Sequence, residues 1–294
     1  MSDRVALAFA DYRAEIAPSV GGAIVRLAWR EIDLLRKTPA EALAMRNVRQ
    51  MASYPLVPYS NRIGHAAFRL GEAEYRLRPN FPGEPHAIHG VGWQRAWTVA
   101  RSTGDSVVLA LKHAADADWP FRFEAEQRIA LSEHGLEVSL RATSLDEQPM
   151  PVGLGFHPFF PIDTHTTLEA TWTGMWEMGG DKLPTQLIAV PSHADYRPAR
   201  KVFDWKIDHC FVGWPRKAVL RYAAHTVTLT ATAGTPKIVC FAPNDGRHFI
   251  ALEPVSHINN AFQLAARGVK DTGMRLLGRG DSFEIGMRIA ASRG

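Results

Sequence analysis

Alternation of apolar and polar residues runs through most of this chain and constrains its fold more than any other feature. A period of two places one side of a segment in a core and the other side in water, as in the strands of antiparallel sheets. Gly, Pro, Asn and Asp separate the alternating segments at short intervals, which is typical of tight turns. We expect strand pairs over 5–16 and 23–35, a hairpin over 67–77, and strands over 107–111, 121–132, 136–143, 168–172, 218–222, 226–232, 237–242, 249–252 and 283–290.

Helical patterns are scarce. Segment 38–49 begins with Thr-Pro and carries an early Glu, which favours one short capped helix, and segment 259–266 favours another turn or two. No flexible linker, repeat or low-complexity segment divides the 294 residues. The sequence therefore predicts one all-β domain over 1–294, in which two large antiparallel sheets pack face to face and one or two short helices are added.

Charge and cysteine usage exclude several classes of protein. The 34 basic residues are scattered among 30 acidic ones without a basic run, so we expect no nucleic-acid partner. No apolar stretch is long enough for a signal peptide or a membrane span, so we expect no membrane partner either. Cys210 and Cys240 form no Cys-x-x-Cys motif and lie in apolar runs. Buried thiols fit a reducing compartment, and we expect a cytoplasmic protein.

Two ionisable residues, His157 and Glu253, each end an apolar, strand-like run and are each followed by proline. A residue before proline is held in an extended conformation, so both side chains are expected at the rim of a sheet. Burial there raises the pKa of a carboxyl group and keeps a histidine near its switching range. One acid and one base across a cleft are the minimum needed to move two protons.

Four other polar residues are expected in loops or at strand ends: Asn61, Arg62, His89 and Asp208. The planar fork of Arg62 suits sugar hydroxyls or an anion, although it equally suits loop carbonyls. Asp208 suits two sugar hydroxyls, or a neighbouring Arg or Lys. His89 is either a ligand-binding residue or a loop histidine bonded to backbone.

Further histidines and tryptophans have competing interpretations. His86 and His89 form a His-x-x-His pair, but without a third ligand this spacing is a weak indication of metal. Trp93 and Trp97 would offer a stacking surface for a sugar, or pack in the core. His257 follows Glu253 on the same expected rim and is a further candidate for substrate contact.

Taken together, these motifs resemble the aldose 1-epimerase (galactose mutarotase) family. The N-terminal part of the resemblance consists of Asn61-Arg62-Ile63-Gly64, Phe68, Gly71, Tyr75, Leu77, Asn80, Ile88-His89-Gly90 and Trp97. Asp208-His209-Cys210-Phe211 is similar to the family's substrate-binding Asp motif, and Leu252-Glu253-Pro254 is similar to the motif that carries its catalytic Glu. The motifs follow the family's order over nearly the whole chain.

The resemblance implies a single large antiparallel β-supersandwich, galactose mutarotase-like, with an open sugar cleft. In that fold Glu253 corresponds to the catalytic general base and His157 to the general acid. Arg62, His89 and Asp208 correspond to residues that contact the sugar, and we add the neighbouring Asn61. A small-molecule sugar is then the substrate, no cofactor is needed, and we expect a monomer or a homodimer.

The chain also departs from galactose mutarotases. Phe156-His157-Pro158 stands where an Asn-His pair is usual, and 255–260 replaces a Gly-rich, Gln-containing stretch. With these departures, the chain resembles a YphB-like branch of the family.

The expected reaction is interconversion of the α and β anomers of a free aldohexose. One alternative is a hexose-6-phosphate 1-epimerase, for which Arg69 and Arg95 are candidates to bind the anion. The other is a non-catalytic carbohydrate-binding β-sandwich, which would need neither Glu253 nor His157.

Overall fold

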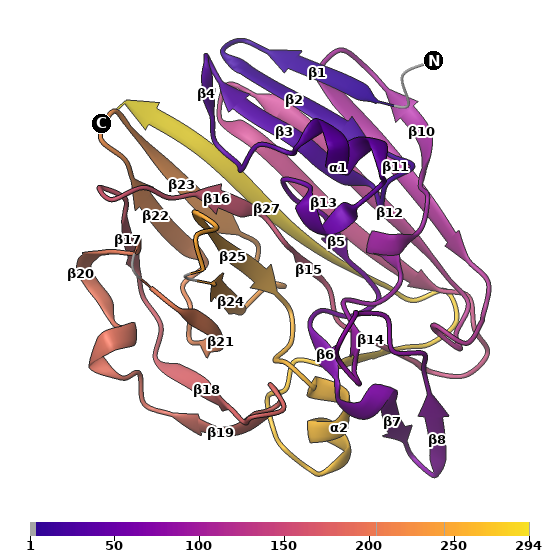
Figure 1. The fold of residues 1–294 in the computed structure, drawn as a ribbon. Helices are drawn as coiled ribbons and strands as arrows, with labels where there is room; N and C mark the ends of the chain where they lie inside the picture. Colours follow the sequence, from indigo (N-terminus) through magenta and orange to yellow (C-terminus); the bar gives the residue numbers. More distant parts are fainter. Residues whose placement is uncertain (1–3, 204, 244, 294) are drawn as a thin grey trace.

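The computed structural model describes residues 4–203, 205–243 and 245–293, and it is built mostly from antiparallel strands with two short α-helices (Figure 1). The largest sheet has nine strands, in the order β10 (Thr98–Ser102), β11 (Ser106–His113), β12 (Phe123–Ser132), β13 (Gly135–Ser144), β27 (Ser282–Arg293), β23 (His225–Ala231), β22 (Lys217–Arg221), β17 (Thr167–Ala170) and β20 (Tyr196–Lys201). This architecture confirms the predicted all-β fold class.

The second sheet has eight strands, most of them short. Seven form the path β19 (Pro184–Ile188), β18 (Gly174–Met178), β21 (Ile207–Val212), β24 (Lys237–Ala242), β25 (Phe249–Val255), β15 (Gly155–Phe156) and β5 (Pro55–Leu56). The eighth, β16 (Phe159–Pro161), also pairs with β25.

Smaller elements complete the fold. One sheet contains β1 (Val5–Phe9), β2 (Tyr12–Ala17), β3 (Ala23–Trp29) and β4 (Ile32–Asp33), and three two-stranded sheets contain β14 (Met150–Val152) with β26 (Arg275–Leu277), β6 (Arg62–Ile63) with β9 (Ala87–Ile88), and β7 (Ala67–Leu70) with β8 (Ala73–Arg76). The helices are α1 (Ala40–Ala44) and α2 (Ala261–Ala266), with 3-10 turns at Val48–Gln50, Gly64–Ala66, Gly92–Gln94 and Ser192–Ala194.

Long strands of the nine-stranded sheet show the alternation on which the fold prediction rests. β12 and β13 pair over ten residues, from Phe123 opposite Ser144 to Ser132 opposite Gly135. Every second residue of β12, beginning at Phe123, is buried, and the residues between are at least partly exposed. The buried side chains of this sheet and of the eight-stranded sheet belong to one continuous hydrophobic core.

Two local predictions differ from the structure. The single helix expected over 38–49 is split into α1 and a 3-10 turn, because Arg46 adopts a left-handed conformation (φ 53°) that a right-handed helix cannot continue through. The strand expected over 249–252 continues to Val255, so Glu253 lies inside β25 rather than at its end. Pro254 is tolerated there because β25 has no ladder partner on one side between Ala251 and Val255.

Candidate active site

The register of three short strands brings His157 and Glu253 together. β15 and β16 flank His157, and both pair antiparallel with β25: Gly155 lies opposite Val255, and Phe159 lies opposite Ala251. The same register on both sides of the interruption places His157 opposite Glu253. Directly opposed residues of an antiparallel pair point to the same face of the sheet. Two positions separated by 96 residues of sequence therefore become neighbours through strand pairing.

The two side chains are in direct contact and almost completely buried. His157 Nε2 lies 3.2 Å from Glu253 Oε1, and the side chains are 8% and 2% exposed. The imidazole packs against the rings of Phe159, at 4.3 Å, and Tyr54, at 4.8 Å, and these two rings lie 6.0 Å from each other. Within the described residues, His157 Nδ1 and Glu253 Oε2 have no hydrogen-bond partner. The pair thus keeps unused hydrogen-bonding capacity, as a site that binds a polar ligand requires.

Burial shifts the pKa values of Glu253 and His157 in opposite directions. Desolvation, together with the charge of Asp208, raises the pKa of Glu253 well above its usual range, and Arg62 opposes this shift. Desolvation, with His89 and Arg36 nearby, lowers the pKa of His157 well below its usual range. Both shifts favour a neutral pair, with a proton on Glu253 and an uncharged His157.

His89 is held as a neutral hydrogen-bond donor. Its ring Nδ1 accepts a hydrogen bond from the backbone N–H of Asn61 at 3.0 Å, and the backbone N–H of His89 donates to the Asn61 carbonyl at 2.9 Å. Burial lowers the pKa of His89 to about 3, so the ring is uncharged and its proton sits on Nε2. Both residues have left-handed backbones, with φ 54° at Asn61 and 63° at His89. Such strain at a ligand-facing pair is typical of functional sites.

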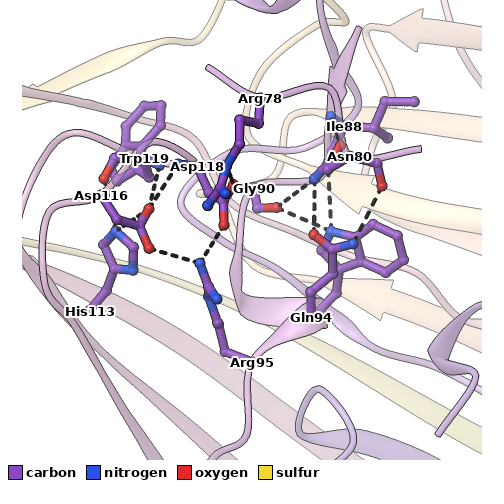
Figure 2. A network of polar contacts seen from close by, with 11 residues as sticks. Arg78, Asn80, Ile88, Gly90, Gln94, Arg95, His113, Asp116, Asp118 and Trp119 are labelled. Carbon is purple, nitrogen blue, oxygen red and sulfur yellow. Dashed lines mark hydrogen bonds and ion pairs between the residues drawn. The ribbon is translucent and has the colours of Figure 1, made fainter. Parts of the chain in front are cut away.

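A network of side-chain amides fixes the backbone on both sides of His89 (Figure 2). Asn80 Oδ1 accepts the N–H of Ile88 at 2.7 Å, and Asn80 Nδ2 donates to the carbonyls of Ile88 and Gly90. Gly90 itself has φ 69°, and a Cβ there would lie 2.3 Å from the Val57 carbonyl oxygen. Only glycine therefore fits after His89, and the neighbouring amide holds the unusual loop in place.

Arg62, Glu84 and Lys182 form an ion-pair network at the rim. Arg62 Nε and Nη2 donate to the two carboxylate oxygens of Glu84 at 2.7 and 2.9 Å, and Lys182 Nζ lies 2.6 Å from Glu84 Oε1. Hydrogen bonds from these cations lower the pKa of Glu84 to about 2. Arg62 Nη1 also lies 4.0 Å from Asp208 Oδ2. The Asp208 side chain is 36% exposed, and burial of its deeper part raises its pKa while Arg62 lowers it.

All six predicted site residues line one cleft of about 1340 Å³, a size that accommodates a monosaccharide together with water. These are Asn61, Arg62, His89, His157, Asp208 and Glu253. Asp208 faces the pair because it lies opposite Phe241 in β24, which in turn lies opposite Ala251, two residues from Glu253 on the same face. The structure therefore brings together the six residues to which the family resemblance and their neighbourhood assigned substrate binding and catalysis.

Other sequence candidates have structural roles. Trp93 and Trp97 are buried and donate their indole N–H groups to loop carbonyls, so neither offers a stacking surface for a sugar. His257 is buried, and its two ring nitrogens bind the Ser60 N–H and the Ile258 carbonyl. His86 is held in the same manner by His65 and Asp181.

Neither of the arginines considered for an anion site faces the cleft. Arg69 lies on the exposed β7–β8 hairpin, and Arg95 is paired with Asp116 and Asp118 in the network of Figure 2. In the described part of the chain, no three His, Cys, Asp or Glu side chains are placed to hold a metal ion. No helix there is long and apolar enough to cross a membrane.

Sequence reasoning missed several residues of the cleft. Tyr54 and Phe159 pack against His157, and Glu84 pairs with both Arg62 and Lys182. Their positions depend on contacts between distant loops, and no motif or spacing marks them. The one available signal was Phe159 itself, two residues after His157 and therefore on the same face of an extended segment.

Comparison with known proteins gives consistent results. A family model described as "Aldose 1-epimerase" matches residues 3–289. The chain is 26% identical over 247 residues to the uncharacterized protein YphB of Escherichia coli K12, covering 80% of this chain and 82% of YphB. A solved structure from Escherichia coli K12 has a TM-score of 0.90 at 22% identity, covering 99% of both chains. The galactose 1-epimerase of Lactobacillus acidophilus NCFM has a TM-score of 0.82 at 15% identity, covering 99% of this chain and 94% of that one.

Proposed function

The chain belongs to the aldose 1-epimerase family, and we propose that it interconverts the α and β anomers of an aldohexose, with Glu253 as general base and His157 as general acid. The observation that carries this proposal is the 3.2 Å contact between the two buried groups inside a sugar-sized cleft. The opposite pKa shifts match a pair that exchanges one proton.

In the proposed reaction, Glu253 removes the proton from the anomeric hydroxyl while His157 donates a proton to the ring oxygen. The bond between C1 and the ring oxygen breaks, and an open-chain aldehyde forms. Rotation about C1–C2 presents the other face of the aldehyde, and reclosure returns both protons to their original carriers. The pair thus begins and ends each half-reaction with one proton, so the buried site never changes its net charge.

The protonation state of the buried pair sets one preliminary step. Because burial favours the proton on Glu253, that proton must pass to His157 before the sugar reacts. The direct contact between Glu253 Oε1 and His157 Nε2 gives this transfer a path without intervening groups. The nearby Arg62, which lowers the pKa of Glu253, favours the ionised carboxylate that results.

Other residues orient the sugar. His89 offers a neutral Nε2–H donor in a fixed direction, and Arg62 offers Nη1 on the same side of the cleft. Asp208 accepts hydrogen bonds from hydroxyl groups. Fixed groups of this kind lower the barrier by holding the sugar in a reactive orientation.

Anomer exchange in Glu253→Gln and His157→Asn variants tests the assignment. Each variant loses one positioned proton-transfer group, so we expect the rate of mutarotation to fall more than about a hundredfold. Polarimetry of freshly dissolved α-glucose and α-galactose measures the rate after subtraction of the spontaneous reaction. Circular dichroism and sugar binding establish that the variants are folded.

Matched substitutions on the outer surface provide the control. Glu137→Gln and His134→Asn change the same residue types at exposed positions, and both are expected to keep the wild-type rate. Wild-type rates in both active-site variants would contradict the proposal. Sugar binding by the wild-type protein without any acceleration of anomer exchange would instead indicate a non-catalytic carbohydrate-binding protein.

A further inference from the structure

Three cations line the cleft beside His157: Arg36, Lys37 and Arg49. We refer to these three residues as the cationic wall. Among the described residues, none of the three has a carboxylate partner, and neither has Lys206, whereas Arg62 and Lys182 contact Glu84 and Arg247 contacts Asp245. No described carboxylate therefore neutralises the positive charge of this wall.

Arg36 is the most firmly held member of the wall. Its Nε and Nη2 donate to the Met51 carbonyl at 3.0 and 2.8 Å, and Nη2 also donates to the Arg49 carbonyl. These acceptors are neutral, so they fix the guanidinium without compensating its charge. Burial lowers the pKa of Arg36 only to about 10, and the group remains charged at neutral pH.

Stacking places this cation close to the reaction centre. The guanidinium carbon of Arg36 lies 3.4 Å from the centroid of the Phe159 ring, and that ring stacks on His157 at 4.3 Å. Arg49 lies over the ring of Phe81, 4.9 Å from its centroid, and is exposed to the cleft. One aromatic ring thus separates His157 from a preorganised cation.

We propose that the substrate is an aldose with an anionic group, phosphoryl or carboxylate, away from its anomeric carbon, and that the cationic wall binds this group. The inference rests on the proposed epimerase function and names the substrate class of the same cleft. A neutral sugar would leave a partly desolvated guanidinium without a counter-charge, which is energetically costly. An anion would satisfy it, and the exposed Lys37 and Arg49 would attract the anion from solution.

Anomer exchange in matched series of sugars tests this inference. One series is glucose, glucose 6-phosphate and glucuronate, and the other is the corresponding galactose series; exchange NMR measures kcat/KM for each. We expect one anionic sugar to exceed its neutral parent by about tenfold or more, the value of one charge-assisted hydrogen bond. The advantage should shrink as salt is added, while the rate for the neutral sugar stays constant. The two anionic arms distinguish a phosphate site from a carboxylate site.

Variants of the exposed members locate the anion. Lys37→Gln and Arg49→Gln should each lower kcat/KM for the preferred anionic sugar by about fivefold to tenfold and change the neutral parent less than about twofold. Both side chains are exposed, so folding is retained without the riskier substitution of Arg36. Arg69→Gln removes an exposed arginine outside the cleft and should change neither rate.

The possible outcomes separate the two proposals. Neutral sugars that react as fast as their anionic counterparts, or variants that slow both substrates equally, would overturn the inference and leave the epimerase function intact. No exchange with any of the six sugars would contradict the epimerase function itself, and with it this inference.

Discussion

The nine-stranded and eight-stranded sheets (Figure 1) differ in how deeply the residues of their central strands are buried. In the nine-stranded sheet, β12 and β13 alternate between buried and more exposed residues over ten positions each. In the eight-stranded sheet, all seven residues of β25 are buried, and both residues of β15 are buried. Charged side chains on the first sheet point into water, whereas Glu253 on the second is surrounded by protein.

This difference shows why the candidate active site lies where it does. A strand covered on both faces desolvates any ionisable side chain it carries, and desolvation is the main cause of the shifts at Glu253 and His157. The alternating sheet instead supplies long registers and core contacts that hold the fold. Both sheets contribute to one hydrophobic core, but the buried ionisable pair lies on the covered one.

The largest effect expected from this difference is on the pH dependence of mutarotation. In the proposed mechanism the pair carries one proton, so a second proton on His157 or loss of the only one should abolish activity. Because the pKa of His157 is lowered, the acid limb should lie below the usual histidine value of about 6.5. Because the pKa of Glu253 is raised, the alkaline limb should lie above the usual carboxyl value of about 4.3.

A profile of kcat/KM against pH measures both limbs, and each pH unit beyond a limb should cost about tenfold. Circular dichroism at each pH controls for unfolding. A flat profile over the range in which the protein is folded would show that this pair is not the acid and base.

Two leucine truncations should separate stability from activity. Leu140 in β13 and Leu252 in β25 are both fully buried, so Leu140→Ala and Leu252→Ala should each lower the free energy of unfolding by about 2–5 kcal/mol. Only Leu252 adjoins Glu253, and a cavity there should shift the carboxylate. We expect kcat to fall in Leu252→Ala and to remain near wild type in Leu140→Ala, as measured by urea unfolding and polarimetry. Equal losses of kcat in both would contradict this difference between the sheets.

A smaller effect is expected at Asn80, which positions His89 without lining the cleft. Asn80→Ala removes the amide that binds Ile88 and Gly90, so His89 loses its fixed orientation. We expect kcat/KM to fall by about tenfold, since a misplaced contact group weakens the orientation of the substrate. Gln94→Ala, which removes a partner of Asn80 but no contact with Ile88 or Gly90, is the matched control and should cost less. An unchanged rate in Asn80→Ala would mean that the loop holds His89 by itself.

Glu253→Gln should also stabilise the fold. The raised pKa of Glu253 means that ionisation costs more in the folded than in the unfolded protein, so its unfavourable contribution grows as pH rises above the usual carboxyl value. Glutamine has the same shape and no charge. We expect the free energy of unfolding at pH 7 to rise by about 0.5–2 kcal/mol, the usual range for stabilising substitutions. The increase should be smaller at pH 4. A loss of stability at pH 7 would show that the carboxylate is compensated in the fold.

Much of the fold and part of the site follow from the sequence. Alternation identified the long strands of the nine-stranded sheet, because each has one face in water. It missed the short strands β5, β15 and β16, whose residues are nearly all buried and so carry no alternation. The prolines that follow them and the family resemblance singled out His157 and Glu253 as candidates. Their contact was not visible, because it depends on the shared register of two short strands with β25.

The cationic wall was beyond sequence reasoning for a related physical reason. Arg36 and Lys37 lie in an irregular segment and Arg49 in a 3-10 turn, all between β4 and β5, where neither period nor motif indicates what a side chain faces. Arg69 and Arg95, the arginines considered instead, belong to a recognisable hairpin and loop but point elsewhere. Which cations converge on a cleft is decided by loop packing, whereas strand periodicity reports only which face of a sheet is buried.

The smallest effect is expected on the outer face of the nine-stranded sheet. Arg141 and Glu284 lie directly opposite each other on β13 and β27, with Arg141 Nη2 2.8 Å from Glu284 Oε2. Both side chains are about half exposed, at 51% and 45%, so water competes for each charge. Arg141→Gln should therefore lower the free energy of unfolding by only about 0.2–1 kcal/mol, and a double-mutant cycle with Glu284→Gln isolates the pair. Mutarotation should be unaffected. A coupling energy above about 2 kcal/mol would show that this exposed pair contributes as much as a buried one. Any loss of kcat would show that the outer face of the sheet influences the cleft.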